Sequence, residues 1–413
     1  MVDRCRQGMV LASGVHQNDP YGSWDLLAAI GAASHFTIPF NQFKNNPFEG
    51  MQQFIDNQDG WCFFHLSYDL KNAIEKLSSS NPDRIQFPEL NVFTPMALVG
   101  IRKGKLYTQG DPAILKELRS RAGQQQCNTT LPDMQVQAVI KQHQYLEAIH
   151  AVKEHIRLGN IYELNFCQEF FGELPATFSP ATLWERLYHS ANAPFSAFYR
   201  WGEHLLCSAS PERFICSHDQ KIIAQPMKGT TRRGATPEED RMLREQLQNN
   251  TKERAENVMI VDLVRNDLSR FAVRGSVKAE ELFGVYPFAT VNQMISTISA
   301  IPQPNTSIET ILNSTFPMGS MTGAPKISAM QLIEQFESSR RGLFSGSVGY
   351  IDPNKQFDMN VIIRSVICHL GQRVCSMQTG GAITDASSPS EEYEESMLKA
   401  RNLFKALNAT LHV

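Results

Sequence analysis

The spacing of hydrophobic positions changes several times along the chain, between the helical period and the alternation typical of strands. Residues 142–158 place apolar side chains at helical spacing and end at a Gly-Asn pair, where helices commonly stop. Residues 161–169 alternate as in a half-buried strand. Thr236-Pro-Glu-Glu239 is a capping box with proline at the first helical position, which predicts a helix start. The chain therefore mixes helical and strand patterns.

Further segments extend this mixed pattern toward the C-terminus. Strands are predicted at 195–201, 205–209, 347–351, 360–369 and 373–378, and helices at 250–267 and after Pro389. The helix at 250–267 is apolar over much of its surface, which predicts that it is buried. Because the strands look antiparallel within a mixed pattern, an α+β fold is favoured over a doubly wound parallel sheet.

The length of 413 residues exceeds that of one ordinary small domain. The stretch 120–137 is rich in Gln, Asn and Thr and contains a proline, so it is the best linker candidate. Before it, short apolar runs mix with frequent Pro, Asn and Gly; after it, elements are easier to assign. We therefore expect an N-terminal region at 1–135 that packs on a second domain at 136–413.

Charge and composition exclude several classes of protein. The net charge is −3 and no block of Lys and Arg occurs, which argues against nucleic-acid binding and against a membrane-surface patch. No run approaches the roughly 18 apolar residues of a membrane span. Residues 1–19 lack an apolar signal region, which predicts a cytoplasmic protein. The eight cysteines include no Cys-x-x-Cys pair, so a zinc ribbon or a thioredoxin-like site is not expected.

The clearest candidate for chemistry is Lys228, in Pro226-Met-Lys-Gly-Thr230. The run is predicted as a turn between a β-rich stretch at 205–225 and the helix that opens at Thr236. A neighbouring glycine allows the backbone to approach a ligand closely. A partly desolvated ammonium would have a lowered pKa and become a usable amine nucleophile. A solvated turn lysine is the alternative.

Two pairs of glutamates lie three residues apart on predicted helices: Glu253 with Glu256, and Glu392 with Glu395. This spacing places both carboxylates of a pair on one helix face, and two such faces meeting would form an oxygen-rich site suited to Mg²⁺. Helix capping is the alternative for both pairs. Capping does not explain Glu256 on so apolar a helix, where an unpaired carboxylate is costly.

Three other features are candidates for anion binding. The loop 315–326 leads into a helix, so its amides could hold an anion. Gly380-Gly381-Ala382 follows a predicted strand and could do the same for a carboxylate, although turn formation is the alternative for both segments. Arg364 lies mid-strand among β-branched residues, so it is either exposed at an edge or directed at a buried anion.

These residues together resemble the chorismate-utilising enzymes, a family that includes anthranilate, aminodeoxychorismate, isochorismate and salicylate synthases. The matching motifs are Ser210-Pro-Glu212, Pro226-Met-Lys-Gly-Thr230, Lys252-Glu-Arg-Ala-Glu256, Val261-Asp-Leu-Val-Arg-Asn-Asp267, Phe316-Pro-Met-Gly-Ser320, Thr322-Gly-Ala-Pro-Lys326 and Glu392-Tyr-Glu-Glu395. They occur in order within residues 140–406, whereas the first 135 residues resemble the family only loosely. The resemblance implies that 136–413 is the chorismate-binding catalytic domain.

The resemblance also implies a fold and a set of site residues. In the family, two large, mostly antiparallel β-sheets pack together under a cover of helices, and chorismate binds through Mg²⁺. By motif, Glu256 and Glu395 correspond to direct or near-direct metal ligands, with Glu253 and Glu392 supporting them through water. Glu212 corresponds to a general acid that protonates the leaving C4 hydroxyl. The substrate-binding positions are Arg364, Lys399, Thr322, Gly380, Gly381 and Ala382.

Particular positions separate the activities of the family. Lys228 matches the aminodeoxychorismate synthases, whereas anthranilate synthases generally carry alanine there. Glu163 occupies the position of the base lysine of the water-using enzymes, which argues against water attack. The chain also lacks a Leu-Leu-Glu-Ser motif resembling a tryptophan feedback site. Two departures concern the substrate pocket. Gln293, a further substrate-binding position by this resemblance, stands where many members have histidine near the C4 hydroxyl, and Phe344 replaces a tyrosine.

The activity implied is that of an aminodeoxychorismate synthase component I, in which Lys228 attacks C2 of chorismate and ammonia then enters at C4. No cysteine lies in a Gly-x-Cys-x-Gly setting, so a separate glutamine amidotransferase is expected to supply the ammonia. Anthranilate synthase component I is the nearest alternative. A non-catalytic, glutaminase-binding regulatory subunit is an alternative of another class. Retention of Glu212, Lys228 and the paired glutamates argues against the regulatory subunit.

Overall fold

The computed structural model describes residues 5–13, 19–22, 24–43, 45–121, 130–288 and 291–412. In this part of the chain the helices are α1 Pro47–Asp56, α2 Lys71–Ile74, α3 Pro112–Arg121, α4 Gln142–Arg157, α5 Pro180–Ala191, α6 Pro237–Asn249, α7 Thr251–Ser269, α8 Ile308–Thr315, α9 Lys326–Phe336 and α10 Pro389–Leu407. Short 3₁₀ turns occur at Tyr68–Leu70 and Gly319–Met321.

The strands of the N-terminal half are β1 Gln7–Ala12, β2 Leu26–Ile38, β3 Cys62–Leu66, β4 Leu90–Arg102, β5 Lys105–Gly110, β6 Met134–Ala138, β7 Glu163–Glu173, β8 Phe195–Trp201 and β9 His204–Ser210. They continue with β10 Arg213–His218, β11 Lys221–Ala224, β12 Met227–Arg232, β13 Lys278–Pro287, β14 Val291–Ala300, β15 Gly323–Ala324, β16 Ser347–Ile351, β17 Phe357–Asn360, β18 Ser365–His369, β19 Val374–Ile383 and β20 Ala409–His412.

Hydrogen bonding joins these strands into one 20-stranded network with two arms that meet at the long pair β2 and β4. One arm runs β4-β3-β16-β17-β10-β11-β14, with β12 and β13 also on β14. The other runs β2-β1-β8-β9-β18-β19-β7-β6-β20. Of the described pairings only that between β6 and β20 is parallel, which confirms the mostly antiparallel α+β prediction.

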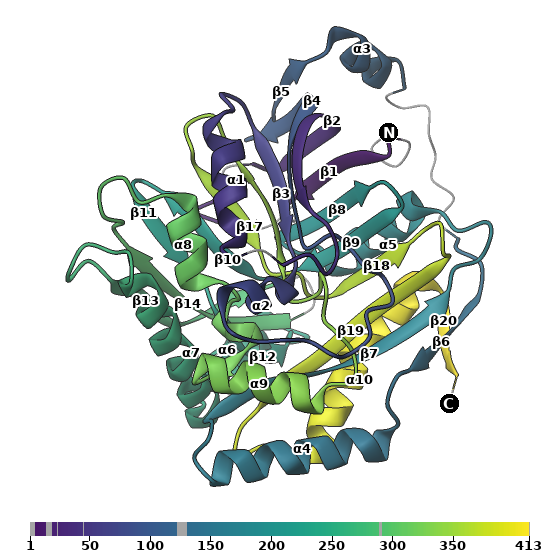
Figure 1. Cartoon of the computed structure of the whole chain (residues 1–413). Helices are drawn as coiled ribbons and strands as arrows, with labels where there is room; N and C mark the ends of the chain where they lie inside the picture. Colours follow the sequence, from purple (N-terminus) through teal and green to yellow (C-terminus); the bar gives the residue numbers. More distant parts are fainter. Residues whose placement is uncertain are drawn as a thin grey trace.

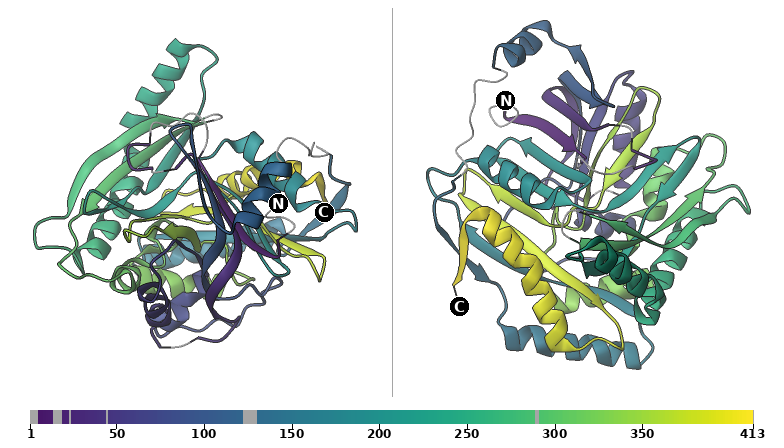
Figure 2. Two further views of the ribbon diagram at one scale, coloured as in Figure 1. Left: turned by 90° about the horizontal axis from the view of Figure 1, so that it is seen from above. Right: turned by 180° about the vertical axis from the view of Figure 1, so that it is seen from behind.

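The two arms pack face to face, because one apolar core contains residues from both. Tyr199 and Leu206 from the second arm lie in the same buried cluster as Ile215, Ile298 and Val348 from the first. The predicted pair of packed sheets is therefore observed as two arms of a continuous network. Helices cover the outside: α4 and α10 contact β19 and each other (Figures 1 and 2), and α9 packs on β7.

Local pattern predicted many elements within a residue or two. The helix at 142–158 is α4, the strands at 195–201 and 347–351 are β8 and β16, and the cap at Thr236 accepts a hydrogen bond from the backbone N–H of Glu239. Thr236 therefore begins α6 as expected.

Three local predictions were wrong. The strand expected at 360–369 is interrupted between β17 and β18, the run 226–230 forms most of strand β12 rather than a turn, and 380–382 lies inside β19 instead of after a strand. The helix α7 also keeps an exposed face, with Val258 40% exposed. Its buried residues include Asn257, Ile260 and Val261. The apolar residues of α7 therefore predicted more burial than the structure shows.

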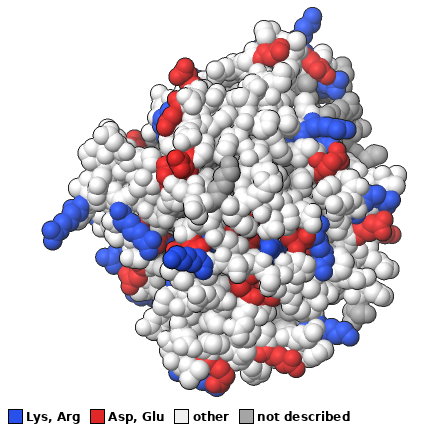
Figure 3. Space-filling model, in the orientation of Figure 1, with Lys and Arg blue, Asp and Glu red and all other residues white. Residues whose placement is uncertain are grey.

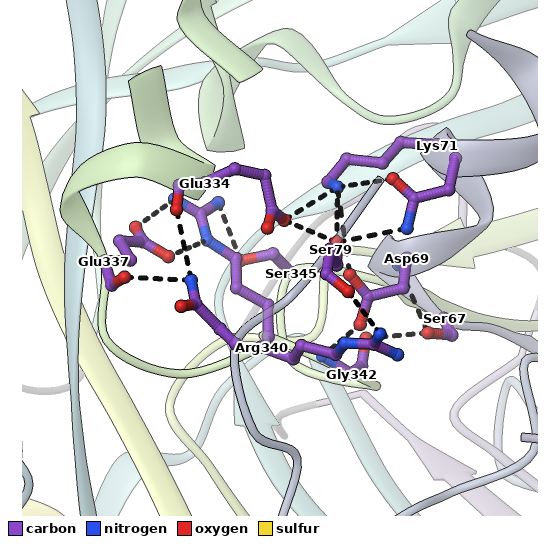
Figure 4. Close-up of polar contacts among 12 residues, drawn as sticks. Ser67, Asp69, Lys71, Ser79, Glu334, Glu337, Arg340, Gly342 and Ser345 are labelled. Atoms are coloured by element: carbon purple, nitrogen blue, oxygen red, sulfur yellow. Dashed lines mark hydrogen bonds and ion pairs between the residues drawn. The ribbon is translucent and has the colours of Figure 1, made fainter. Parts of the chain in front are cut away.

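The N-terminal residues share strands and polar contacts with the rest of the chain. Backbone pairing joins β1 to β8 and β3 to β16. A buried polar network connects segment 67–79 with α9 and the residues after it (Figure 4). There, fully buried Lys71 donates to Glu334 Oε1 (2.8 Å) and to Ser79 Oγ (3.1 Å). The division into two domains at residue 135 stays a prediction, and the linker residues 122–129 lie outside the described part of the chain.

This network extends to the loop that precedes α9. Arg341 forms a buried bidentate pair with Glu337, at 3.0 and 2.6 Å, and donates to the carbonyl of Met321. Bidentate pairing fixes a guanidinium in orientation as well as in place. Arg341 therefore ties the loop around Met321 to the packed interior.

The exterior agrees with the composition. Acidic and basic side chains are interspersed over the face seen in Figure 3, without a large field of one sign. No helix in the described part of the chain is long and apolar enough to cross a membrane.

Candidate active site

Lys228 lies at an irregular point of β12. The register between β12 and β14 shifts between Met227 and Thr230, and Gly229 has φ +81°, a conformation that favours glycine. The shift directs Lys228 toward β7, where its Nζ lies 2.6 Å from Glu163 Oε1. The side chains are only 12% and 2% exposed, so this is a buried ion pair.

The electrostatic environment of Lys228 differs from the expected one. Burial disfavours the ammonium, but Glu163, Glu256 and Glu212 outweigh burial and raise the pKa of Lys228 above its ordinary value. The expected lowering of its pKa is therefore wrong. Lys228 is held as a cation at rest and must lose a proton before its nitrogen can attack an electrophile.

Glu212 follows the end of β9 and is 6% exposed. Its backbone N–H donates to Ser210 Oγ (3.2 Å), and its carbonyl accepts from the N–H of Val361 (3.1 Å), so the backbone is held on both sides. Burial raises the pKa of Glu212 to about 7, although the Ser320 hydrogen bond and the Lys228 charge lower it. A carboxyl with a pKa near the working pH is suited to general acid catalysis.

The two glutamate pairs lie at the starts of α7 and α10, close to glycine backbones. A Cβ on Gly229 would lie 2.9 Å from Glu253 Oε2, and one on Gly381 would lie 3.2 Å from Glu392 Oε2 and 3.7 Å from Glu395 Oε1. A side chain at either position would crowd these carboxylates, which explains why both residues are glycine. The paired carboxylates therefore line the same region as β12 and β19.

The charges of these glutamates are only partly balanced. Burial raises the pKa of Glu256 to about 7 and also raises that of Glu392. For Glu395, burial is outweighed by Lys399, and its pKa is lowered; Lys399 Nζ lies 2.6 Å from Glu395 Oε1. Among the described residues no cluster of three or more His, Cys, Asp or Glu side chains is arranged to hold a metal. As a set of carboxylate oxygens with surplus negative charge, the four glutamates nevertheless fit Mg²⁺ chemically.

Two cations face this acidic region. Arg364 precedes β18 with φ +53°, so the mid-strand prediction was wrong. Its guanidinium makes no hydrogen bond or ion pair with the described residues, and burial lowers its pKa, opposed by the Glu395 charge. Burial likewise lowers the pKa of Lys399, against the opposing effect of Glu395. A partly buried guanidinium with no partner among the described residues is a candidate anion site.

Backbone donors of β19 adjoin Lys399. Lys399 Nζ donates to the carbonyl of Gly380 (2.7 Å), so that carbonyl points away from β7. The N–H and C=O of one strand residue point to the same side, and this side alternates along the strand. The N–H groups of Gly380 and Ala382 therefore both point toward Lys399, whereas the N–H group of Gly381 points toward β7.

Thr322 and Gln293 are engaged inside the protein. The Thr322 N–H donates to the carbonyl of Gly319 (3.1 Å), and its hydroxyl also bonds within this loop. Gln293 donates to the carbonyl of Gly229 (2.8 Å) and accepts from Thr230 Oγ1 (2.8 Å). Gln293 thus holds the irregular stretch of β12, and the substrate contacts expected of both residues stay predictions.

The contacts that Ser320 and Glu163 make in the site were not predicted from the sequence. Ser320 belongs to a matched motif, but its hydrogen bond to Glu212 depends on how the loop folds back. The family resemblance identifies Glu163 as a replacement for lysine and does not predict its contact with Lys228. Because β7 is buried on both faces, the alternation along residues 161–169 could not have singled out Glu163.

The positive side chains and backbone N–H groups gathered here are chemically suited to binding a small anion. The chain belongs to the chorismate binding enzyme family, whose sequence model matches residues 13–405. The aminodeoxychorismate synthase component 1 of Escherichia coli strain K12 is 33% identical over 429 residues, covering 97% of this chain and 93% of that protein.

Two further comparisons bear on length and fold. The chloroplastic aminodeoxychorismate synthase of Arabidopsis thaliana is 37% identical over 309 residues, covering 74% of this chain but 32% of that protein. The chain thus spans about a third of the length of the plant relative. Anthranilate synthase component I from Streptococcus pneumoniae TIGR4 superposes with a TM-score of 0.81 at 22% identity, covering 94% of this chain and 93% of that one. The superposition confirms the predicted α+β fold of the chain.

The burial of Glu212 predicts a stability effect that depends on pH. Because the folded-state pKa of about 7 lies above the ordinary 4.5, the folded protein binds the proton more tightly. This stability is complete below pH 4.5 and is lost as the pH rises through 7. Glu212→Gln cannot ionise, so its free energy of unfolding should exceed that of wild type by about 3 kcal/mol at about pH 8, and differ little near pH 4.

Urea unfolding at the two pH values measures this difference. Glu147→Gln, an exposed position on α4, is the matched control and should show no such dependence on pH. A stability difference for Glu212→Gln that is the same at both pH values would contradict the assigned burial effect.

Proposed function

We propose that the protein is an aminodeoxychorismate synthase of the component I type, which converts chorismate and ammonia into 4-amino-4-deoxychorismate for p-aminobenzoate and folate synthesis. The observation that supports this most is the buried ammonium of Lys228, paired with Glu163 and affected by the charge of Glu212, a carboxyl whose pKa is raised to about 7. The curated relatives with this name support the same activity.

The substrate carries carboxylates, and the site offers groups for them. Arg364 and Lys399 supply positive charge, and the outward N–H groups of Gly380 and Ala382 supply hydrogen bonds. In the proposal, Glu256 and Glu395 hold Mg²⁺ with support from Glu253 and Glu392. Bound there, the ion would neutralise the ring carboxylate of the substrate.

The proposed chemistry needs an amine nucleophile and an acid. Neutral Lys228 Nζ forms a bond to C2, the two conjugated ring double bonds shift, and the bond from C4 to its hydroxyl breaks. Glu212 gives its proton to that hydroxyl, which leaves as water. Ammonia then bonds to C4, the double bonds shift back, and the C2–Nζ bond breaks, returning neutral Lys228. The ammonium formed at C4 loses one proton, which restores the carboxyl of Glu212. Two allylic displacements place the amino group on the carbon that carried the hydroxyl.

Ammonia would come from a separate glutamine amidotransferase subunit, in a cytoplasmic complex. The support is the name of the E. coli relative, a component 1, together with the absence of a Gly-x-Cys-x-Gly motif from the sequence. Delivery of ammonia to a buried site by a partner avoids its protonation in bulk water.

Product identification tests the proposed reaction. With chorismate, Mg²⁺ and an ammonium salt, the purified chain should form 4-amino-4-deoxychorismate, detected by mass spectrometry, without release of pyruvate. Glu212→Gln is the matched inactive variant and should lose about 100-fold or more in rate. Anthranilate and pyruvate as products would identify the alternative activity, and binding of chorismate without turnover would favour a regulatory subunit.

Nitrogen supply tests the proposed partner. The chain alone should use ammonium salts but not glutamine, because it has no nucleophile assigned to amide hydrolysis. Addition of a glutamine amidotransferase subunit should make glutamine an effective donor, measured as product formed per minute. Glutamine hydrolysis by the purified chain alone would overturn the need for a partner.

A further inference from the structure

We propose that Glu163 is a further catalytic residue, the proton acceptor that converts the Lys228 ammonium into the neutral amine and later returns the proton. The inference rests on the proposed function, because it concerns the lysine that would attack chorismate. The proposed role belongs to the position where the water-using members of the family carry a base lysine and this chain carries Glu163.

The geometry is that of a donor and an acceptor in direct contact. Lys228 Nζ lies 2.6 Å from Glu163 Oε1, within the range of a charge-assisted hydrogen bond. It is the single hydrogen bond found for this ammonium in the described part of the chain. A proton leaving Lys228 along this bond therefore arrives on Glu163.

The second oxygen of Glu163 also supports the assignment. Glu163 is 1% exposed, and its Oε2 has no hydrogen-bond partner among the described residues. A purely structural buried carboxylate normally satisfies both oxygens, since an unpaired buried oxygen is costly. With one oxygen bonded to the nucleophile and the other free, this carboxylate keeps capacity to take up a proton.

The backbone fixes Glu163 in place. Residue 163 begins β7 and pairs with Ala324 of β15, and the N–H of neighbouring Tyr162 donates to the carbonyl of Ala324 (2.7 Å). Such support limits movement of the carboxylate away from Lys228. An acceptor held within hydrogen-bond distance satisfies the first geometric requirement for a general base.

Other charged groups face the pair but make no contact with Lys228 Nζ among the described residues. They are Glu256 from α7, Glu212 after β9, and Glu395 and Lys399 from α10. Their carboxylates favour the ammonium and raise the pKa of Lys228. Spontaneous loss of the proton to water is thereby disfavoured, which increases the need for an internal acceptor.

The proton balance closes over one catalytic cycle. One ammonium proton moves from Lys228 to Glu163, giving a neutral amine and a neutral carboxylic acid. The amine then forms and later breaks its bond to C2 as described above. When neutral Lys228 is released, Glu163 returns the proton, and the resting ion pair is restored. No oxidant, reductant or further reactant is required.

A charge-pairing role alone predicts the opposite kinetic effect. If Glu163 only stabilised the ammonium, its removal would lower the pKa of Lys228 and speed the attack. If Glu163 accepts the proton, its removal slows the attack even though the amine is easier to deprotonate. The two roles therefore differ in the sign of the change in rate.

The test is the single-turnover rate of chorismate consumption in excess enzyme with Mg²⁺ and without ammonia, for wild type and Glu163→Gln. Glutamine keeps the size and an oxygen that accepts a hydrogen bond, but takes up no proton. We expect the variant to be slower by at least about 100-fold. Between about pH 5.5 and 7 its rate relative to wild type should rise with pH, because the proton must then leave to solvent.

Controls separate this inference from the proposed function and from folding. Glu173→Gln, at the exposed far end of β7, should keep the wild-type rate, and circular dichroism should show all three proteins folded. Failure of wild type to make 4-amino-4-deoxychorismate from ammonia would refute the proposed function. Wild-type product formation, with Glu163→Gln at an equal or higher single-turnover rate, would refute the role of Glu163 alone.

Discussion

The site depends on the burial of one ammonium among several carboxylates. A lone buried cation is costly, and for Lys228 that cost is offset by Glu163 at 2.6 Å together with the surrounding glutamates. The same burial raises the pKa of Glu212 to about 7, which lets that carboxyl carry a proton near neutrality. One constraint thus provides both the lysine and the carboxyl group that the proposed mechanism uses.

The architecture delivers these groups from separate elements onto one region. Lys228 comes from an irregular stretch of β12, Glu163 from the start of β7, and Glu212 from the connection after β9. The helices α7 and α10 add their first-turn glutamates against glycine backbones. Since the strands belong to one hydrogen-bonded network around a shared core, small displacements between these groups are resisted.

Local elements were predictable from sequence, but contacts between distant residues were not. The helix α4 and the cap at Thr236 follow from periodicity and capping, which act over a few residues. The left-handed backbone of Arg364 and the strand that contains Lys228 depend on pairing with distant segments. Likewise, motifs identified the candidate residues, whereas the ion pair across 65 positions between Glu163 and Lys228 required the fold. The sign of the Lys228 pKa shift followed from that pairing.

The central claim is that Lys228 acts as a nucleophile rather than as a structural cation. The most direct measurement is the rate of 4-amino-4-deoxychorismate formation by Lys228→Ala with saturating ammonia, beside Lys116→Ala, an exposed position on α3, as the matched control. The account predicts that Lys228→Ala loses at least about 100-fold in rate while it still binds chorismate and remains folded. A folded Lys228→Ala enzyme that makes the same product at the wild-type rate would contradict it.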